Sequence, residues 1–255
     1  MDDMTSDLAD RVQRSFSRSF ASYHEAALQQ AWIAGQLVQE LRAAGAAGPF
    51  TSALELGCGT GHLTRRLTTG FDISELTLND ISPQAQGTAR AHQAAFLCGD
   101  AGQIDWPEKP DLIVSASMIQ WLRDPARLLQ RAAESLAPGG WLAVSGFGPE
   151  QYRELVKIGS SSGAPGLCRA EDLAEAVRGK LEVVSACETL RPMTFETPRK
   201  VLEHLRNTGV NGRAAKRWSK SSLAAFSDDY MRYFGAQDGV SLTYHLIWMV
   251  ARRPA

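Results

Sequence analysis

Three glycines at alternate positions are the feature that most limits what this chain can fold into. They lie in ALELGCGTGHL, residues 53–63, directly after a short apolar run and directly before a segment with helical character. A strand, a glycine turn and a helix in this order are typical of nucleotide-binding α/β proteins, in which the turn lets the backbone approach a ligand closely. The dinucleotide fingerprint GxGxxG needs a glycine where this chain has His62. The turn therefore favours a different ligand.

Strand and helix patterns alternate around and after this turn. The expected strands are 52–56, 75–80, 94–100, 110–117 and 140–147, and the expected helices are 62–67, 82–93 and 125–136. Alternation at this spacing predicts βαβ units, and therefore a mostly parallel sheet with helices on both faces. Ligands of such sheets bind beyond the carboxyl ends of the strands. The residues expected at that edge are Gly57, Asp80, Asp100 and the run from Ser115 to Ser117.

The composition excludes several classes of protein. The chain has 255 residues, 44% of them hydrophobic, and its net charge of −1 argues against nucleic-acid binding. No apolar run approaches the roughly 20 residues of a membrane span, and the acidic start MDDMTSDLAD does not resemble a signal peptide. We therefore expect a cytoplasmic protein without a membrane partner. The four cysteines form no CxxC pair, so we expect reduced thiols and no metal site.

A single domain over residues 1–255 is expected. Its parts are cap helices in 1–45, a cofactor-binding core in 46–148, an insert with a sixth strand in 149–240, and a closing strand in 241–255. The regular alternation stops after residue 149, where mainly helical segments follow. This insert is expected to face the substrate.

Three acids define the expected ligand of the turn. Glu55 would repel a pyrophosphate at short range and would suit an ammonium group. Asp80 ends the second strand, where an acid accepts hydrogen bonds from a ribose diol, and Asp100 can accept one from an adenine amino group. S-adenosylmethionine (AdoMet), an adenosine joined to an amino acid, meets all three conditions. The expected cofactor-binding residues are Glu55, Gly57, Cys58, Gly59, Gly61, Asp80, Ile81, Asp100, Ala101 and Ser115.

Four successive segments resemble the motifs of class I AdoMet-dependent methyltransferases: LELGCGTGHLTRRL, LNDISPQA, CGDAGQIDWP and PDLIVSASMIQWL. The resemblance implies a Rossmann-like α/β fold with a mostly parallel seven-stranded sheet, N-terminal cap helices and a helical lid or insert after strand 5. Segments outside the cofactor site resemble the malonyl-[acyl-carrier protein] O-methyltransferase family over nearly the whole chain: RSFSRSFASYHEAALQQ, MIQWLRDP, FGPEQYRELV, LRNTGVNG and LTYHLIWMVARR.

This resemblance implies a reaction. The free carboxylate of a malonyl group, carried by acyl carrier protein or coenzyme A, would attack the methyl group of AdoMet. The products would be a methyl ester, an early intermediate of pimeloyl and biotin synthesis, and S-adenosylhomocysteine (AdoHcy). A carboxylate is already ionised at pH 7, so we expect no general base, and catalysis would consist of positioning and partial desolvation.

The resemblance also suggests residues that meet the substrate. Arg153 is the first candidate for binding the malonyl carboxylate, because a guanidinium binds carboxylates bidentately. Tyr23 is expected to cap the cofactor pocket, and His245 is a weaker candidate for a direct role. Gln120 and Trp121 are expected to contact substrate or carrier. Some relatives have an asparagine where this chain has Ala116, so a polar contact there is missing or supplied by another residue.

A basic segment suggests how a carrier protein would dock. Residues 191–220 contain eight Arg or Lys residues against two Glu residues, so their balance is 8 − 2 = +6. Acyl carrier proteins are strongly acidic and would be attracted to such a face. Arg213 and Arg217 are the candidate carrier-binding residues.

Two other functions fit the same cofactor motifs. One is a class I methyltransferase that acts on a small carboxylic acid or a quinone precursor. The other is a protein that binds AdoMet without catalysis and acts as an interaction partner.

Overall fold

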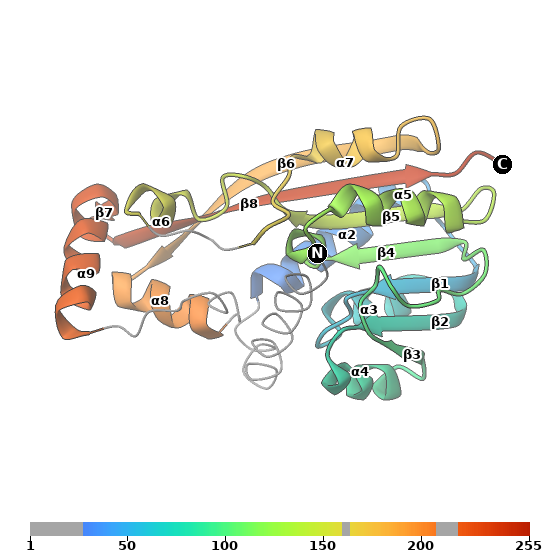
Figure 1. Cartoon of the computed structure of the whole chain (residues 1–255), viewed down its shortest axis with the longest axis horizontal. Helices are drawn as coiled ribbons and strands as arrows, with labels where there is room; N and C mark the ends of the chain where they lie inside the picture. The colour runs from blue at the N-terminus through green and yellow to red at the C-terminus, as the bar shows by residue number, and fades with distance from the viewer. Residues whose placement is uncertain (1–27, 160–163, 208–218) are drawn as a thin grey trace.

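The computed structural model describes residues 28–159, 164–207 and 219–255, which form one mixed sheet with helices on both faces (Figure 1). The strands are β1 (Phe50–Leu56), β2 (Ile73–Asp80), β3 (Ala95–Cys98), β4 (Leu112–Ala116), β5 (Trp141–Phe147), β6 (Glu182–Phe195), β7 (Gly235–Ala236) and β8 (Gly239–Arg252). The helices are α2 (Leu28–Ala43), α3 (His62–Gly70), α4 (Gln86–Ala91), α5 (Pro125–Ser135), α6 (Arg153–Lys157), α7 (Ala170–Ala176), α8 (Pro198–Asn207) and α9 (Lys220–Phe234).

The parallel part of the sheet reverses its order at β1. The strands run β3-β2-β1-β4-β5-β8-β6, and β1 pairs parallel with β2 on one side and with β4 on the other. β2 and β3 therefore lie on one side of β1, and β4 and β5 lie on the other. The connections that follow β1 and β4 cover opposite faces of the sheet. A crevice opens at the carboxyl ends of strands at such a reversal, and ligands of open α/β sheets bind there.

Side-chain alternation along each strand divides the core into two layers. In β5, Trp141, Ala143 and Phe147 pack on the face covered by α2 and α3, whereas Leu142 and Val144 pack on the face covered by α5 and α7. Successive residues of a strand point to opposite faces, so a strand buried on both faces is apolar throughout. All seven residues of β5 are buried, as expected for a central strand.

The helices begin where the sequence provides a stop or a cap. Asp124 caps α5, since its carboxylate accepts a hydrogen bond from the Arg127 amide at 3.0 Å, and Pro125 occupies the first helical position. The helix expected over 82–93 is shorter than predicted. A 3-10 turn, Pro83–Ala85, precedes α4, and the Ser82 side chain makes no hydrogen bond to a helix amide.

The sheet has one short strand more than the seven expected. The additional strand is β7, which has two residues and pairs with the start of β8. The other expected strands and the closing strand are confirmed, and the sixth strand expected within 149–240 is β6. Among the described residues, no helix is long and apolar enough to cross a membrane.

β8 joins the parallel core to the insert. It pairs antiparallel with β5 from Leu246 to Arg252, and with β6 from Val240 to Arg252. β6 and β8 therefore extend past the end of β5, and Figure 1 shows α6, α8 and α9 around this extension. The residues of the predicted insert thus pack around β8, the last strand in the sequence, and its partner β6.

Beside the extended part of β8, side chains accept the backbone hydrogen bonds that a neighbouring strand would otherwise accept. The Thr243 amide donates to Glu154 Oε2 and the His245 amide donates to Gln151 Oε1, both at 2.9 Å. The Tyr152 amide in turn donates to the Thr243 carbonyl at 2.9 Å. Glu154 is 2% exposed and also accepts a hydrogen bond from the Thr243 hydroxyl. The turn after β5 thus continues the ladder where β5 has ended.

We expect Glu154→Ala to destabilise the protein by about 2–4 kcal/mol, because it leaves the amide and hydroxyl of Thr243 buried without an acceptor. Urea unfolding followed by circular dichroism measures this loss. Glu150→Ala is the matched control, since the Glu150 side chain is 43% exposed, and its cost should be within about 0.5 kcal/mol. Equal costs for the two variants would show that the side-chain ladder does not stabilise β8.

Candidate functional site

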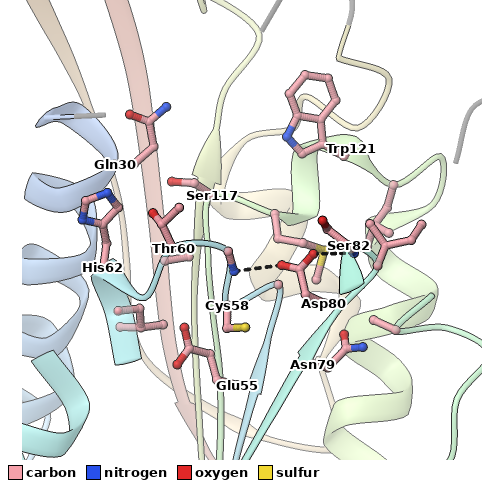
Figure 2. Close-up of a pocket in the computed structure, with 18 of the residues that line it drawn as sticks. Gln30, Glu55, Cys58, Thr60, His62, Asn79, Asp80, Ser82, Ser117 and Trp121 are labelled. Carbon is pink, nitrogen blue, oxygen red and sulfur yellow. Dashed lines mark hydrogen bonds between the residues drawn. The ribbon is translucent and has the colours of Figure 1, made fainter. Parts of the chain in front are cut away.

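A cavity of about 290 Å³ lies at the carboxyl ends of β1, β2 and β4. Its walls are the glycine turn after β1, the residues that end β2, the loop after β4, and the N-terminal half of α2, which contributes Gln30 and Ala34 (Figure 2). The size is close to the lower end of the range of ligand pockets. The site therefore lies at the reversal of strand order.

The three glycines of the turn are required for two physical reasons. All three have positive φ values, 73° at Gly57, 49° at Gly59 and 83° at Gly61, where side chains are disfavoured. A Cβ on Gly57 would lie 2.5 Å from Met118 Cγ, and one on Gly61 would lie 2.8 Å from Thr88 Cγ2. A Cβ on Gly59 would meet nothing within 4 Å. Gly57 and Gly61 thus serve packing, whereas Gly59 leaves space on the cavity side.

The end of β2 holds the turn in place. The Asn79 carbonyl accepts hydrogen bonds from the Gly57 and Cys58 amides, both at 2.9 Å. The Asp80 carboxylate accepts one from the Gly59 amide and one from the Ser82 amide, both at 2.8 Å. Burial raises the pKa of Asp80, and these backbone amides oppose the rise. Asp80 therefore positions the turn as well as lining the cavity.

Glu55 is the most unusual charge of the site. It lines the cavity with only 1% of its surface exposed, and its Oε2 has no hydrogen-bond partner among the described residues. Burial raises the pKa of Glu55 to about 8, and the nearby charge of Asp80 adds to the rise. A buried carboxyl group with an unpartnered oxygen fits a ligand that brings a positive charge. The ammonium group of AdoMet is such a charge.

Most of the predicted cofactor residues line this cavity. They are Glu55, Gly57, Cys58, Gly59, Asp80, Ile81, Asp100 and Ala101. Asp100 is exposed, and its Oδ1 accepts a hydrogen bond from the Gly102 amide at 2.7 Å. Gly61 lies behind the turn at the start of α3. Ser115 is buried, and its hydroxyl donates to the Leu56 carbonyl at 2.9 Å, so the structure does not bring it to the cavity.

The predicted substrate residues are divided between the cavity and other places. Trp121 lines the cavity. Gln120 is buried behind it and donates to the Ser117 carbonyl. The Arg153 side chain is 53% exposed and pairs with Glu150 at 3.7 Å, away from the cavity lining. Tyr23, Arg213 and Arg217 lie outside the described residues.

His245 is a buried residue with both ring nitrogens engaged. Its Nδ1 accepts a hydrogen bond from the Glu150 amide at 3.1 Å, and its Nε2 lies 2.8 Å from Glu188 Oε2. Because Nδ1 accepts, Nε2 carries the proton and donates it to Glu188. His245 does not line the cavity, and the ring has the geometry of a structural histidine.

Several lining residues were not predicted from the sequence: Gln30, Thr60, His62 and Arg123. Thr60 and His62 follow directly from their positions in and after the glycine turn. Ser117, which was expected at the ligand-binding edge with Ser115 and Ala116, does line the cavity, although no contact with the cofactor was assigned to it. Gln30 carries no motif, and only the packing of α2 against the sheet brings it to the cavity.

Comparisons with known proteins agree with this geometry. A family model described as "Methyltransferase domain" matches residues 54–142. The chain is 34% identical to the malonyl-[acyl-carrier protein] O-methyltransferase of Chlorobium phaeovibrioides, with 95% of each chain covered. It is 33% identical to the enzyme of the same name from Bacteroides thetaiotaomicron, with 95% of this chain and 97% of the relative covered.

A solved structure shares the fold. It is the N-methyltransferase NodS from Bradyrhizobium japonicum in complex with S-adenosyl-L-homocysteine, with a TM-score of 0.53 and 17% identity. The match covers 96% of this chain and 100% of NodS. The architecture is therefore that of the class I methyltransferases, as the sequence motifs indicated.

Gly57→Ala and Gly59→Ala should have different effects. The Gly57 variant forces a Cβ against Met118, so we expect it to lose at least 2 kcal/mol of stability in urea unfolding. The Gly59 variant should lose only about 1 kcal/mol, from its positive φ, but should bind AdoHcy at least tenfold more weakly in calorimetry because its methyl group enters the cavity. Equal stability losses would contradict this assignment.

Glu55→Gln should stabilise the ligand-free protein in a pH-dependent way. The pKa of Glu55 is about 8 in the folded state and about 4.3 in an unfolded chain. Ionisation therefore favours unfolding progressively from about pH 4.5 to pH 8, and glutamine removes this cost. The stability difference between variant and wild type should grow over that range in urea unfolding. A difference independent of pH would show that Glu55 is already ionised in the folded state.

Proposed function

The chain belongs to the malonyl-[acyl-carrier protein] O-methyltransferase family, and we propose that it transfers the methyl group of AdoMet to the free carboxylate of a malonyl thioester on acyl carrier protein. The observation that carries the proposal is the cavity at the reversal of strand order. It combines a glycine turn, a buried carboxyl group with one unpartnered oxygen and a second acid at the end of β2. This set fits an adenosyl amino acid.

Particular residues would hold the cofactor. The buried Glu55 carboxylate would pair with the ammonium group, and Gly59 would admit the ligand close to the backbone. The Asp80 carboxylate accepts from the backbone amides of Gly59, Ser82 and Ile81, and its remaining acceptor capacity could serve the ribose hydroxyls. Asp100 and Ala101 line the part of the cavity next to β3, and they would contact the adenine.

The chemistry needs no proton transfer. The bound cofactor supplies an electrophilic methyl group on a sulfonium. A carboxylate oxygen of the acceptor forms the new O–C bond while the S–C bond breaks, which gives a methyl ester and AdoHcy. The acceptor is ionised at pH 7, so no base has to act. The protein's part is to align the two groups and exclude water, which can contribute about 7–11 kcal/mol.

A carrier protein is the proposed partner. Methylation removes the charge of the malonyl end, and this fits the early step of pimeloyl and biotin synthesis implied by the family. The carrier would approach the basic segment 191–220, and Arg213 and Arg217 remain the proposed docking residues. Within the described part of this segment, Arg199 and Lys200 of α8 both pair with Glu203. The positive charge that attracts the acidic carrier protein would therefore come mainly from the other basic residues of the segment.

A methyl-transfer assay tests the proposed function. We expect label from methyl-labelled AdoMet to appear in a base-labile methyl ester with malonyl-[acyl-carrier protein], and more slowly with malonyl-CoA. Acetyl-[acyl-carrier protein], which has no free carboxylate, is the matched control and should take up no label. Transfer to a substrate without a carboxylate, or none to either malonyl thioester while AdoHcy still binds, would overturn the proposal.

A further inference from the structure

Ser117 has a strained backbone at the edge of the cavity. It directly follows β4 and lines the cavity, and its φ of 57° lies in the left-handed region that disfavours residues with a Cβ. Non-glycine residues in this region persist where the surroundings enforce them, and they concentrate at functional sites. The strain therefore calls for a physical reason.

Hydrogen bonds on both sides hold Ser117 in this conformation. Its amide donates to the Ser145 carbonyl of β5 at 3.0 Å, and its carbonyl accepts from Gln120 Nε2 at 2.5 Å. Gln120 is 2% exposed, so the donor is itself fixed by packing. The direction of the Ser117 side chain is thus determined by the backbone, not by a partner of its hydroxyl.

The Ser117 hydroxyl lies in the cavity wall without a partner. Its Oγ is buried and makes no hydrogen bond with any described residue. Gln30 of α2 lines the same cavity, is 6% exposed, and has an Oε1 that is buried and unpartnered in the same way. Figure 2 shows the Ser117 hydroxyl directed toward the side of the cavity where Gln30, Thr60 and His62 lie. Buried polar groups are rarely left unpaired, so a ligand group is expected between them.

A carboxylate is the ligand group that suits these side chains. The hydroxyl donates a hydrogen bond, and a primary amide turned by 180° presents its NH₂ group without changing its outline. A carboxylate only accepts, so it can satisfy both donors. Among the described lining residues, Arg123 is the only arginine or lysine, and it is an exposed residue of the loop after η2 (Ile119–Trp121). The Ser117 hydroxyl and the Gln30 amide themselves carry no charge.

We propose that Ser117, with Gln30 on the facing wall, forms a carboxylate-binding subsite in the cavity. The proposal rests on the proposed function for its two sources of a carboxylate, which are the amino-acid end of AdoMet and the methyl acceptor. Neutral donors suit the acceptor because they orient one oxygen and leave the negative charge on the other. An arginine clamp would reduce the nucleophilicity of that oxygen. Ser117 would then supply the polar contact that Ala116 lacks.

Two substitutions of Ser117 separate the hydroxyl from the backbone strain. Ser117→Gly relieves the positive φ and removes the hydroxyl, whereas Ser117→Asn tolerates the same φ and restores a donor. Two constants are measured for each variant: the Kd of AdoHcy by calorimetry, and the KM for malonyl-[acyl-carrier protein] at saturating AdoMet. Ser117→Gly should raise one of them about tenfold and Ser117→Asn should restore it within about threefold. The constant that moves identifies which carboxylate is bound.

One further variant tests the effect of a negative charge at the subsite, and another controls for the relief of backbone strain. Gln30→Glu places a negative charge beside the subsite and should raise the same constant by more than tenfold. Lys109→Gly relieves a comparable φ of 45° away from the cavity and should change neither constant.

Two results would overturn the subsite. In the first, both the Kd of AdoHcy and the acceptor KM stay within twofold of the wild-type values in Ser117→Gly and in Gln30→Glu. The second is an increase of the acceptor KM in Arg123→Gln while Ser117→Gly raises neither the acceptor KM nor the Kd of AdoHcy. If the wild type methylates no malonyl thioester, the proposed function fails, and the AdoHcy measurement alone decides the subsite.

Discussion

The site depends on the hydrogen bonds between the glycine turn and the end of β2. The Asn79 carbonyl and the Asp80 carboxylate together accept three consecutive amides of the turn, Gly57 to Gly59. These bonds fix backbone in a region of φ that only glycine adopts without strain. Because β2 and β1 are paired in register up to this point, the two strands end together and the turn cannot shift along them. The cavity is the space that this turn leaves open.

The electrostatics of the cavity follow from that packing. Glu55 and Asp80 are held close together in a region from which water is largely excluded, and burial raises the pKa of both. A ligand with a positive charge would stabilise the ionised form of these acids, and this would offset the cost of burying their charge. On the side of Gln30 and Ser117 the wall offers neutral polar groups instead. The two acids and the two neutral polar groups therefore offer different contacts to a ligand in the same cavity.

The outer part of the molecule depends on β8. This strand continues past β5, and Glu154 and Gln151 supply the acceptors that a neighbouring strand would have supplied. α8 and α9 are attached to this extension (Figure 1), so the region that follows β5 in the chain is built on the same sheet as the part that forms the cavity. Two of the residues suggested by the family segments, Arg153 and His245, lie beside this extension, where their side chains contact Glu150 and Glu188.

The sequence by itself determined the alternating strands and helices, the glycine turn, and the acids at Glu55, Asp80 and Asp100, because strand ends and turns depend on residues adjacent in the chain. It also determined the family, through motifs spread over most of the chain. Tertiary structure alone decided which side chains share a cavity. Gln30 is brought there from α2 by packing, Ser117 by the pairing of β4 with β5, and Ser115 is turned away by the two-residue period of the strand. Such placements depend on contacts between segments distant in sequence, which local patterns do not encode.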